Sequence, residues 1–194
     1  MASPDPRLIL ASASPRRAAL LRALGVPFRV IVTGVDESLL EGEDGAAAAE
    51  RLARLKASAV RETGGLPVLG ADTVVLCDGA ILGKPASSDD AVRMLRSLSG
   101  RTHEVVTGVA IAAGDRLISG FDRTAVRFGV LTEAQITWYV DTGEPLGKAG
   151  AYHIDGGAAA FIESLSGSPS NVAGLPVRLV LDLARGARLN LGVP

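Results

Sequence analysis

The chain has 194 residues, 47% of them hydrophobic, and a formal net charge of −1, so it can bury one sizeable core or form one domain with two lobes. The near-neutral charge argues against a protein that coats nucleic acid or an anionic membrane. Cys77 is the only cysteine, which excludes an internal disulfide and a cysteine-based zinc cluster. No apolar run reaches the length of a membrane span, and the first residues lack a signal-peptide pattern. We expect a cytoplasmic protein.

Short apolar runs typical of strands alternate with amphipathic runs typical of helices. Strands are predicted in residues 7–12, 28–34, 68–85 (two strands around an Asp-Gly turn), 102–128 (two strands around a hairpin) and 158–165. Helices are predicted in residues 15–24, 45–63, 88–98, around Trp138 and in 172–185. The pattern has no repeat and no linker, and it predicts an α/β domain with a mixed sheet.

The first predicted helix begins with two arginines. Ser14 is the expected N-cap and Pro15 suits the first helical position, so Arg16 and Arg17 stand at the positive end of the helix dipole. This placement is unfavourable by roughly a few tenths of a kcal/mol. The exposed N–H groups and two guanidinium groups would bind a phosphate or a carboxylate. Alternatively, both arginines are solvated or pair with surface carboxylates.

Two further charges fall among apolar residues. Lys56 lies on the apolar side of the second predicted helix, where a lysine either snorkels to the edge or reaches into a cleft. Asp72 interrupts an apolar run, and a buried carboxylate needs a cation, a metal ion or strong donors. The alternative is that Asp72 forms a turn between two strands. Lys84 closes the next strand beside Pro85, where a lysine is usually solvated.

Basic and acidic groups therefore gather at strand and helix ends in the combination that a metal–polyphosphate complex requires. Cleavage of a phosphoanhydride depends mainly on positioning, charge neutralisation and a base for water. The basic candidates are Arg16, Arg17, Lys56 and Lys84, and the acidic ones are Glu37 and Asp72.

Eight motifs occur in an order that resembles the Maf family of nucleoside triphosphate pyrophosphatases. They are LILASASPRR, VDES, RLARLKA, GADTVV, LGKP, LSGRTHEVVTGVAI, GEPLGKAGAY and SNVAGLPV, which together span about residues 8–183. The resemblance implies a single Maf-like domain over residues 1–194, with a fold like that of inosine triphosphate pyrophosphatases. That fold is an elongated mixed sheet with flanking helices and a cleft between two lobes. The resemblance also implies a homodimer that hydrolyses a nucleoside triphosphate with Mg²⁺ or another divalent cation such as Mn²⁺.

The resemblance further implies a role for each candidate residue. Phosphates would be bound by Ser14, Arg16 and Arg17, and the positive clamp completed by Lys56 and Lys84. The metal would be held by Glu37 and Asp72, with Thr73 lining the site. Asp72 would be the general base, and the expected catalytic residues are Asp72, Glu37 and Lys84.

The segment after GEP separates the subgroups of this family. GKAGAYHIDG keeps Lys148, Ala151 and Tyr152 of the dTTP/UTP-hydrolysing group, which typically has DKAGAYGIQG, and departs from it at Gly147, His153 and Asp155. A carboxylate only accepts hydrogen bonds, whereas an amide also donates. Asp155 would meet the N–H of uracil or thymine but repel the carbonyl oxygens. The alternatives are that Asp155 faces the metal or solvent.

The resemblance implies three possible functions. The first is a housecleaning pyrophosphatase acting on dTTP, UTP or modified pyrimidine nucleotides. The second is the same chemistry on another base, such as 7-methyl-GTP. The third is a regulator of septum formation that binds nucleotides without turnover. A water-activating carboxylate favours an enzyme over a pure binding protein.

Overall fold

The computed structural model describes residues 5–193, whose seven strands form one mixed sheet. The strands are β1 (Leu8–Leu10), β2 (Phe28–Val30), β3 (Val68–Cys77), β4 (Ala80–Leu82), β5 (Thr102–Ala113), β6 (Arg116–Phe128) and β7 (Ile162–Ser166). Their order is β2-β1-β3-β5-β6-β7, and β4 pairs with β3. β1 is parallel to β2 and β3, whereas the β3–β4 and β6–β7 pairs are antiparallel. The predicted mixed sheet and its opening β-α-β unit are confirmed.

The first helix begins at its predicted cap, Ser14. The helices are α1 (Pro15–Ala23), α2 (Gly45–Ala59), α3 (Ser88–Leu98), α4 (Glu133–Asp141), α5 (Pro169–Val172) and α6 (Val177–Gly186), with 3₁₀ turns η1 (Ala149–Ala151) and η2 (Gly157–Phe161). Ser14 caps α1 by accepting a hydrogen bond from Arg17 N–H, and Asp44 caps α2 in the same way. Gly25, with φ +69°, follows the end of α1 as expected. The Asp78-Gly79 turn has positive φ at both residues, as a two-residue hairpin requires.

Strands β1, β2 and β4 and helix α2 end earlier than predicted, β1 at Leu10 and β4 at Leu82. β2 ends at Val30 because its partner β1 itself ends at Leu10. α2 ends at Ala59, and the chain beyond it is irregular. There the Glu62 carbonyl accepts a hydrogen bond of 3.0 Å from Arg29 Nη2 instead of continuing a helix.

The C-terminal quarter departs most from the prediction. The last helix, predicted from residue 172, begins only at Val177, because Gly174 adopts φ +99° and Pro176 cannot donate a backbone hydrogen bond. The short helix α5 before it was not predicted. The predicted last strand begins only at Ile162, where it pairs with Phe128 of β6. The residues before Ile162 form the 3₁₀ turn η2.

The described residues divide into two compact units. The first unit contains the residues up to Asp72, Thr107–Asp122 and the residues from Gly174 onward, and the second contains Thr73–Val106 and Arg123–Ala173. Strands β3, β5 and β6 contribute residues to both units. The predicted single domain with two lobes and an intervening cleft stays a prediction.

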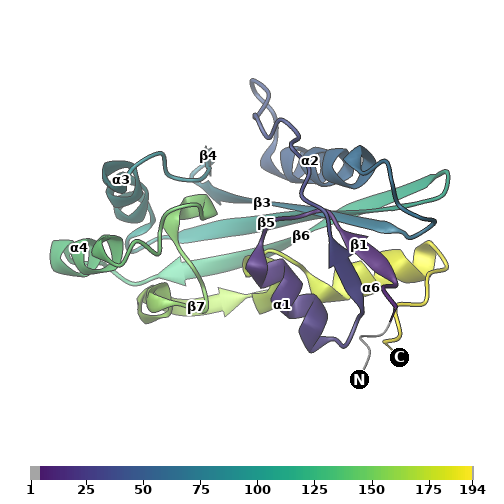
Figure 1. The fold of residues 1–194 in the computed structure, drawn as a ribbon. Helices are drawn as coiled ribbons and strands as arrows, with labels where there is room; N and C mark the ends of the chain where they lie inside the picture. The colour runs from purple at the N-terminus through teal and green to yellow at the C-terminus, as the bar shows by residue number, and fades with distance from the viewer. Residues whose placement is uncertain (1–4, 194) are drawn as a thin grey trace. The chain divides into compact units, whose positions relative to one another are not determined.

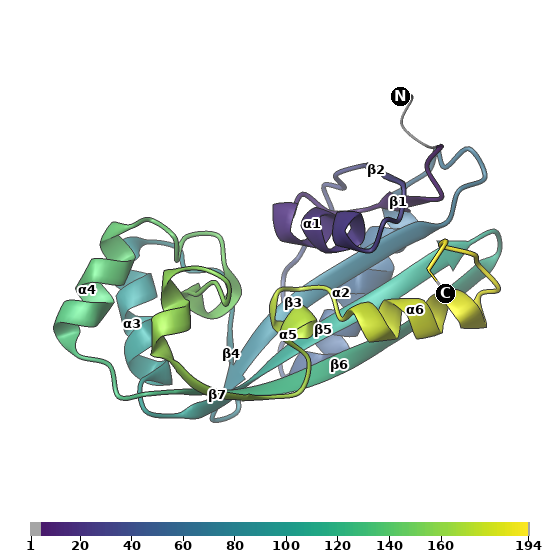
Figure 2. The same cartoon turned by 90° about the horizontal axis from the view of Figure 1, so that it is seen from below.

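In the first unit, helices cover both faces of the sheet. α2 lies on one face, and α1 and α6 lie on the other (Figures 1 and 2). α2 packs directly on the strands, because a Cβ at Gly70 of β3 would overlap the backbone at Ala53, and one at Gly108 of β5 would overlap Ala49. The opposite face buries an apolar core that includes Leu10, Leu21, Leu69, Val109 and Val180.

In the second unit, α3 and α4 lie side by side (Figures 1 and 2), linked by an ion pair between Arg96 and Glu133. The core of this unit is rich in aromatic residues. Phe128 makes edge-to-face contacts with His103, Tyr152 and Phe161 at centroid distances of 4.9, 5.0 and 6.1 Å.

Candidate active site

A buried lysine joins two carboxylates in the first unit. Lys56, near the end of α2, places its Nζ 2.6 Å from Asp72 Oδ1 and 2.7 Å from Glu37 Oε1. Lys56 is 6% exposed and Asp72 is 8% exposed. Because Lys56 is buried with its ammonium group against the two carboxylates, the alternative that it snorkels to the edge is wrong.

The fold explains why Lys56 and Asp72 meet. β3 continues through Asp72, so the alternative of a turn-forming aspartate is wrong. Residues two apart in a strand point to the same face, and Gly70 of β3 faces α2. Asp72 therefore points toward α2, which carries Lys56. The buried carboxylate has the cation that its desolvation requires.

Arg17 is buried beside this group. Its Nε donates to the Gly174 carbonyl at 2.7 Å, and its Nη1 donates to the Ala71 carbonyl at 2.8 Å and to Ser12 Oγ at 3.1 Å. Burial lowers the pKa of Arg17, while Asp72 acts in the opposite direction. The solvated alternative is therefore wrong for Arg17. Its guanidinium group ties the segment after β1 to β3 and to the segment before α6.

The start of α1 keeps the features of an anion site. Ser14 caps the helix, and its own N–H donates to Ser12 Oγ at 3.1 Å. Arg16 is half-buried, and its positive charge contributes to the lowered pKa of Arg17. A helix N-terminus with an adjacent guanidinium group suits a phosphate.

Glu37 and Asp72 fit the requirements of a divalent cation. Both supply hard carboxylate oxygens, and both lie against the same ammonium group. Among residues 5–193, no group of three or more His, Cys, Asp or Glu side chains could hold a metal ion. Mg²⁺ commonly takes one or two carboxylates, with phosphate oxygens and water completing its shell. The pair would therefore suit a cation that arrives with a polyphosphate.

The remaining predicted site residues belong to the second unit. Thr73 follows Asp72 directly in β3 and is half-buried. Lys84 is exposed after β4, and Asp155 is exposed in the turn between η1 and η2. Their roles in a site stay predictions.

Sequence reasoning missed the glutamate that organises residues 143–157. Glu144 Oε1 accepts a hydrogen bond of 2.7 Å from Tyr139 Oη, and its Oε2 accepts one of 3.1 Å from Gly157 N–H. Tyr139 Oη also accepts a bond of 3.0 Å from His153 N–H. The signature residue Lys148 donates to the Glu144 carbonyl at 2.9 Å. The position of Glu144 in the GEP motif was the available signal.

Tyr152, which the sequence comparison singled out in the segment after GEP, lies in the core. Its hydroxyl is 2.9 Å from His103 Nε2, and desolvation raises the pKa of Tyr152. Within residues 5–193, His103 Nδ1 has no hydrogen-bond partner, and burial lowers the pKa of His103 to about 4. Both side chains therefore stay neutral near pH 7 and serve the packing of the second unit.

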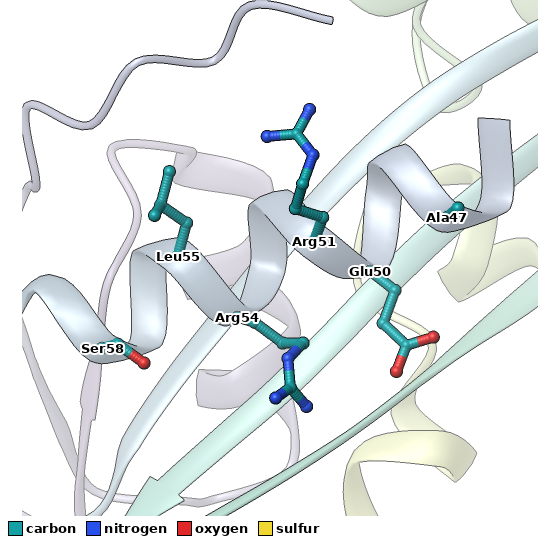
Figure 3. Close-up of a pocket in the computed structure, with 6 residues that line it drawn as sticks. All are labelled: Ala47, Glu50, Arg51, Arg54, Leu55 and Ser58. Carbon is teal, nitrogen blue, oxygen red and sulfur yellow. The ribbon is translucent and has the colours of Figure 1, made fainter. Parts of the chain in front are cut away.

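A separate hollow of about 500 Å³ opens on the outer side of α2 (Figure 3). Its lining residues are Ala47, Glu50, Arg51, Arg54, Leu55 and Ser58. None of these is a predicted site residue. Ser119 Oγ donates to Glu50 at 2.6 Å and accepts from Arg54 at 2.9 Å, so these two side chains are occupied in joining α2 to β6.

Across residues 5–193, no helix has both the length and the apolar character needed to cross a membrane.

Comparison with known proteins identifies the family. The profile described as Maf-like protein matches residues 7–187, so the chain belongs to the Maf family. It is 52% identical over 179 residues to a dTTP/UTP pyrophosphatase of Symbiobacterium thermophilum, covering 91% of this chain and 92% of that protein. A dTTP/UTP pyrophosphatase of Geotalea uraniireducens is 50% identical over 181 residues, covering 92% and 93%. The predicted family is confirmed.

Solved structures give more distant similarities. A HAM1 protein from Coxiella burnetii aligns with a TM-score of 0.44 and 16% identity, over 64% of this chain and 73% of that one. A nucleoside-triphosphatase (dITP/XTP pyrophosphatase) from Mycobacterium abscessus aligns with a TM-score of 0.39 and 18% identity, over 62% and 72%.

Proposed function

We propose that this Maf protein hydrolyses nucleoside triphosphates to the monophosphate and pyrophosphate, with dTTP and UTP as its preferred substrates. Relatives that share about half of its sequence over more than nine-tenths of the chain are dTTP/UTP pyrophosphatases. The observation that carries the proposal is the contact of the buried Lys56 with Asp72 and Glu37. A carboxylate pair beside a buried cation suits hydrolysis better than simple anion binding.

Phosphate binding is assigned to the start of α1. The cap hydroxyl of Ser14 and the half-buried guanidinium group of Arg16 bind the triphosphate there. Arg17, which is buried, adds positive charge while it donates hydrogen bonds to two backbone carbonyls and one hydroxyl group. The anion therefore offsets the unfavourable placement of two cations at a helix N-terminus.

Hydrolysis is assigned to Asp72. Its carboxylate takes a proton from water as the water oxygen bonds to the α-phosphorus, and the bond from that phosphorus to the bridging oxygen breaks. Pyrophosphate leaves with the bonding electrons. Lys56 holds the Asp72 carboxylate in place through their ion pair. A divalent cation, Mg²⁺ or Mn²⁺, held by Glu37 and Asp72 would neutralise charge on the phosphates.

Base selection is assigned to the segment that contains Asp155. An exposed carboxylate there accepts a hydrogen bond from the N–H of uracil or thymine. In this proposal the protein is a cytoplasmic homodimer with a housecleaning role, which removes modified pyrimidine nucleotides.

A product assay across a nucleotide panel tests the proposal. The purified protein is given dTTP, UTP, GTP or 7-methyl-GTP with Mg²⁺ or with EDTA, and the products are separated. Monophosphate and pyrophosphate should form from dTTP and UTP only with the cation. Preferred cleavage of 7-methyl-GTP would favour the second function. Nucleotide binding without any product would favour the septum regulator. Orthophosphate release would contradict the proposed bond cleavage.

A further inference from the structure

The segment that carries Glu37 has no secondary structure of its own. Residues 31–44 connect β2 to α2 without a helix or strand, and most of them are exposed. The Glu37 side chain is 39% exposed, although its partner Lys56 is buried. An ion pair with so exposed a member contributes about 0–1 kcal/mol. The ion pair with Lys56 is therefore a weak anchor for Glu37.

A second residue of α2 holds this segment. Arg51 Nε donates to Glu43 Oε1 at 2.6 Å, and its Nη2 donates to Glu43 Oε2 at 2.7 Å. The two parallel bonds form a fork, which fixes both side chains in one geometry. Nη2 also donates to the Ser38 carbonyl at 3.1 Å. Arg51 therefore contacts the segment at two places, Ser38 and Glu43.

The contact at Ser38 acts on Glu37 directly. Asp36 Oδ1 accepts hydrogen bonds from Ser38 N–H at 2.9 Å and from Ser38 Oγ at 2.6 Å, which closes a turn around Glu37. Because Arg51 holds the carbonyl of Ser38, it fixes one end of that turn. Glu43 Oε2 also accepts a hydrogen bond of 3.2 Å from Leu40 N–H, which links residues 40 and 43 of the segment.

We propose that Arg51 and Glu43 form a clamp that positions Glu37 for the metal–triphosphate complex. The clamp rests on the proposed function, because it presumes that Glu37 holds the divalent cation. Arg51 and Glu43 are positioning residues and touch neither nucleotide nor cation. Without the clamp, Glu37 samples other positions, and each productive encounter with the cation first has to order the segment.

Three variants test the clamp against a matched control. Arg51→Ala removes the fork, Arg51→Lys keeps the charge without the fork, and Glu43→Gln removes the acceptor charge. Arg54→Ala is the control, since Arg54 lies one turn along α2, points away from Arg51 (Figure 3) and donates a hydrogen bond to Ser119 Oγ of β6. All four keep Glu37, Lys56 and Asp72 intact.

The first readout is the metal requirement of pyrophosphate release. The three clamp variants should raise the Mg²⁺ concentration for half-maximal rate about tenfold, as loss of a residue that orients a metal ligand typically does. Their kcat at saturating Mg²⁺ should stay near that of the parent. The Arg51→Ala/Glu43→Gln double variant should be no worse than either single variant, because both remove one interaction. Arg54→Ala should leave the requirement unchanged.

The second readout is amide hydrogen exchange of residues 35–44, which requires no activity. Exchange there should accelerate in the clamp variants and stay unchanged in Arg54→Ala. An unchanged metal requirement with a lowered melting temperature would overturn the proposal, since a merely structural pair gives that result. Unchanged exchange would also overturn it. Failure of the parent to release pyrophosphate would instead contradict the proposed function, while hydrogen exchange would still judge the clamp. If Arg51→Ala does not fold, Arg51→Lys and Glu43→Gln decide.

Discussion

The Nζ atom of Lys56 lies 2.6 Å from Oδ1 of Asp72, and each residue is more than nine-tenths buried, at 6% and 8% exposure. Helix α2 and strand β3 supply one charge each. Since each charge compensates the desolvation of the other, the two residues form one energetic unit.

Removal of Lys56 alone should therefore be costly. Lys56→Met leaves the Asp72 carboxylate buried without its cation, which typically lowers the free energy of unfolding by about 3–5 kcal/mol. Lys56→Met/Asp72→Leu replaces both charges by apolar groups and should recover a large part of that loss. Urea denaturation of the two variants measures the difference. A double variant less stable than Lys56→Met would contradict a coupled buried pair.

The two arginines of α1 should respond differently to truncation. Arg17→Ala removes the guanidinium donor from the carbonyls of Gly174 and Ala71 and from Ser12 Oγ, and should lower the free energy of unfolding by several kcal/mol at about 1–3 kcal/mol for each group left unsatisfied. Arg16→Ala should weaken nucleotide binding with little effect on stability. Thermal melts and nucleotide titrations separate these outcomes. Equal losses of stability would count against the distinct roles.

Stability should fall in mild acid because of His103. Burial lowers the pKa of His103 from 6.5 to about 4. Protonation then favours the unfolded chain, so this contribution is complete above about pH 6.5 and declines as the pH falls toward about 4. The full loss is about 3 kcal/mol. Urea denaturation at several pH values, compared with His103→Gln, isolates this slope. Identical slopes in both proteins would show that carboxylates alone cause the acid sensitivity.

Asp155 tests base selection. Asp155→Gln supplies an amide that satisfies both an N–H and a carbonyl of uracil or thymine, which is worth about 1–3 kcal/mol. The kcat/KM for UTP and dTTP should then rise roughly tenfold relative to guanine nucleotides. If Asp155 binds metal, activity should instead fall on every substrate and the metal requirement should increase. No change in either property leaves Asp155 as a solvated carboxylate.

Local signals in the sequence predicted most of the fold. Ser14, Pro15 and Gly25 marked the ends of α1 because capping acts within one turn. The break between α5 and α6 was equally local, at Gly174 and Pro176, but the apolar period on both sides concealed it. The length of β2 depended on its partner β1, which no local pattern specifies.

The candidate site was predictable in residue type but not in contacts. Charges at Lys56 and Asp72 stood out against apolar neighbours, and the structure places them together. The anchoring of Arg17 on the Gly174 carbonyl joins residues 157 positions apart, which sequence patterns cannot reveal. Arg51 escaped notice because a helix-surface arginine looks solvated until the irregular segment that it holds is seen.

The most direct test of the account is Asp72→Asn, examined for turnover and nucleotide binding in the same preparation. Asparagine keeps the shape of the side chain but takes no proton from water, so kcat should fall by roughly 10²-fold or more. The affinity for a non-hydrolysable dTTP analogue should stay close to that of the parent. A variant that binds the analogue normally and turns over dTTP at a near-normal kcat would contradict the assignment of Asp72 as the base.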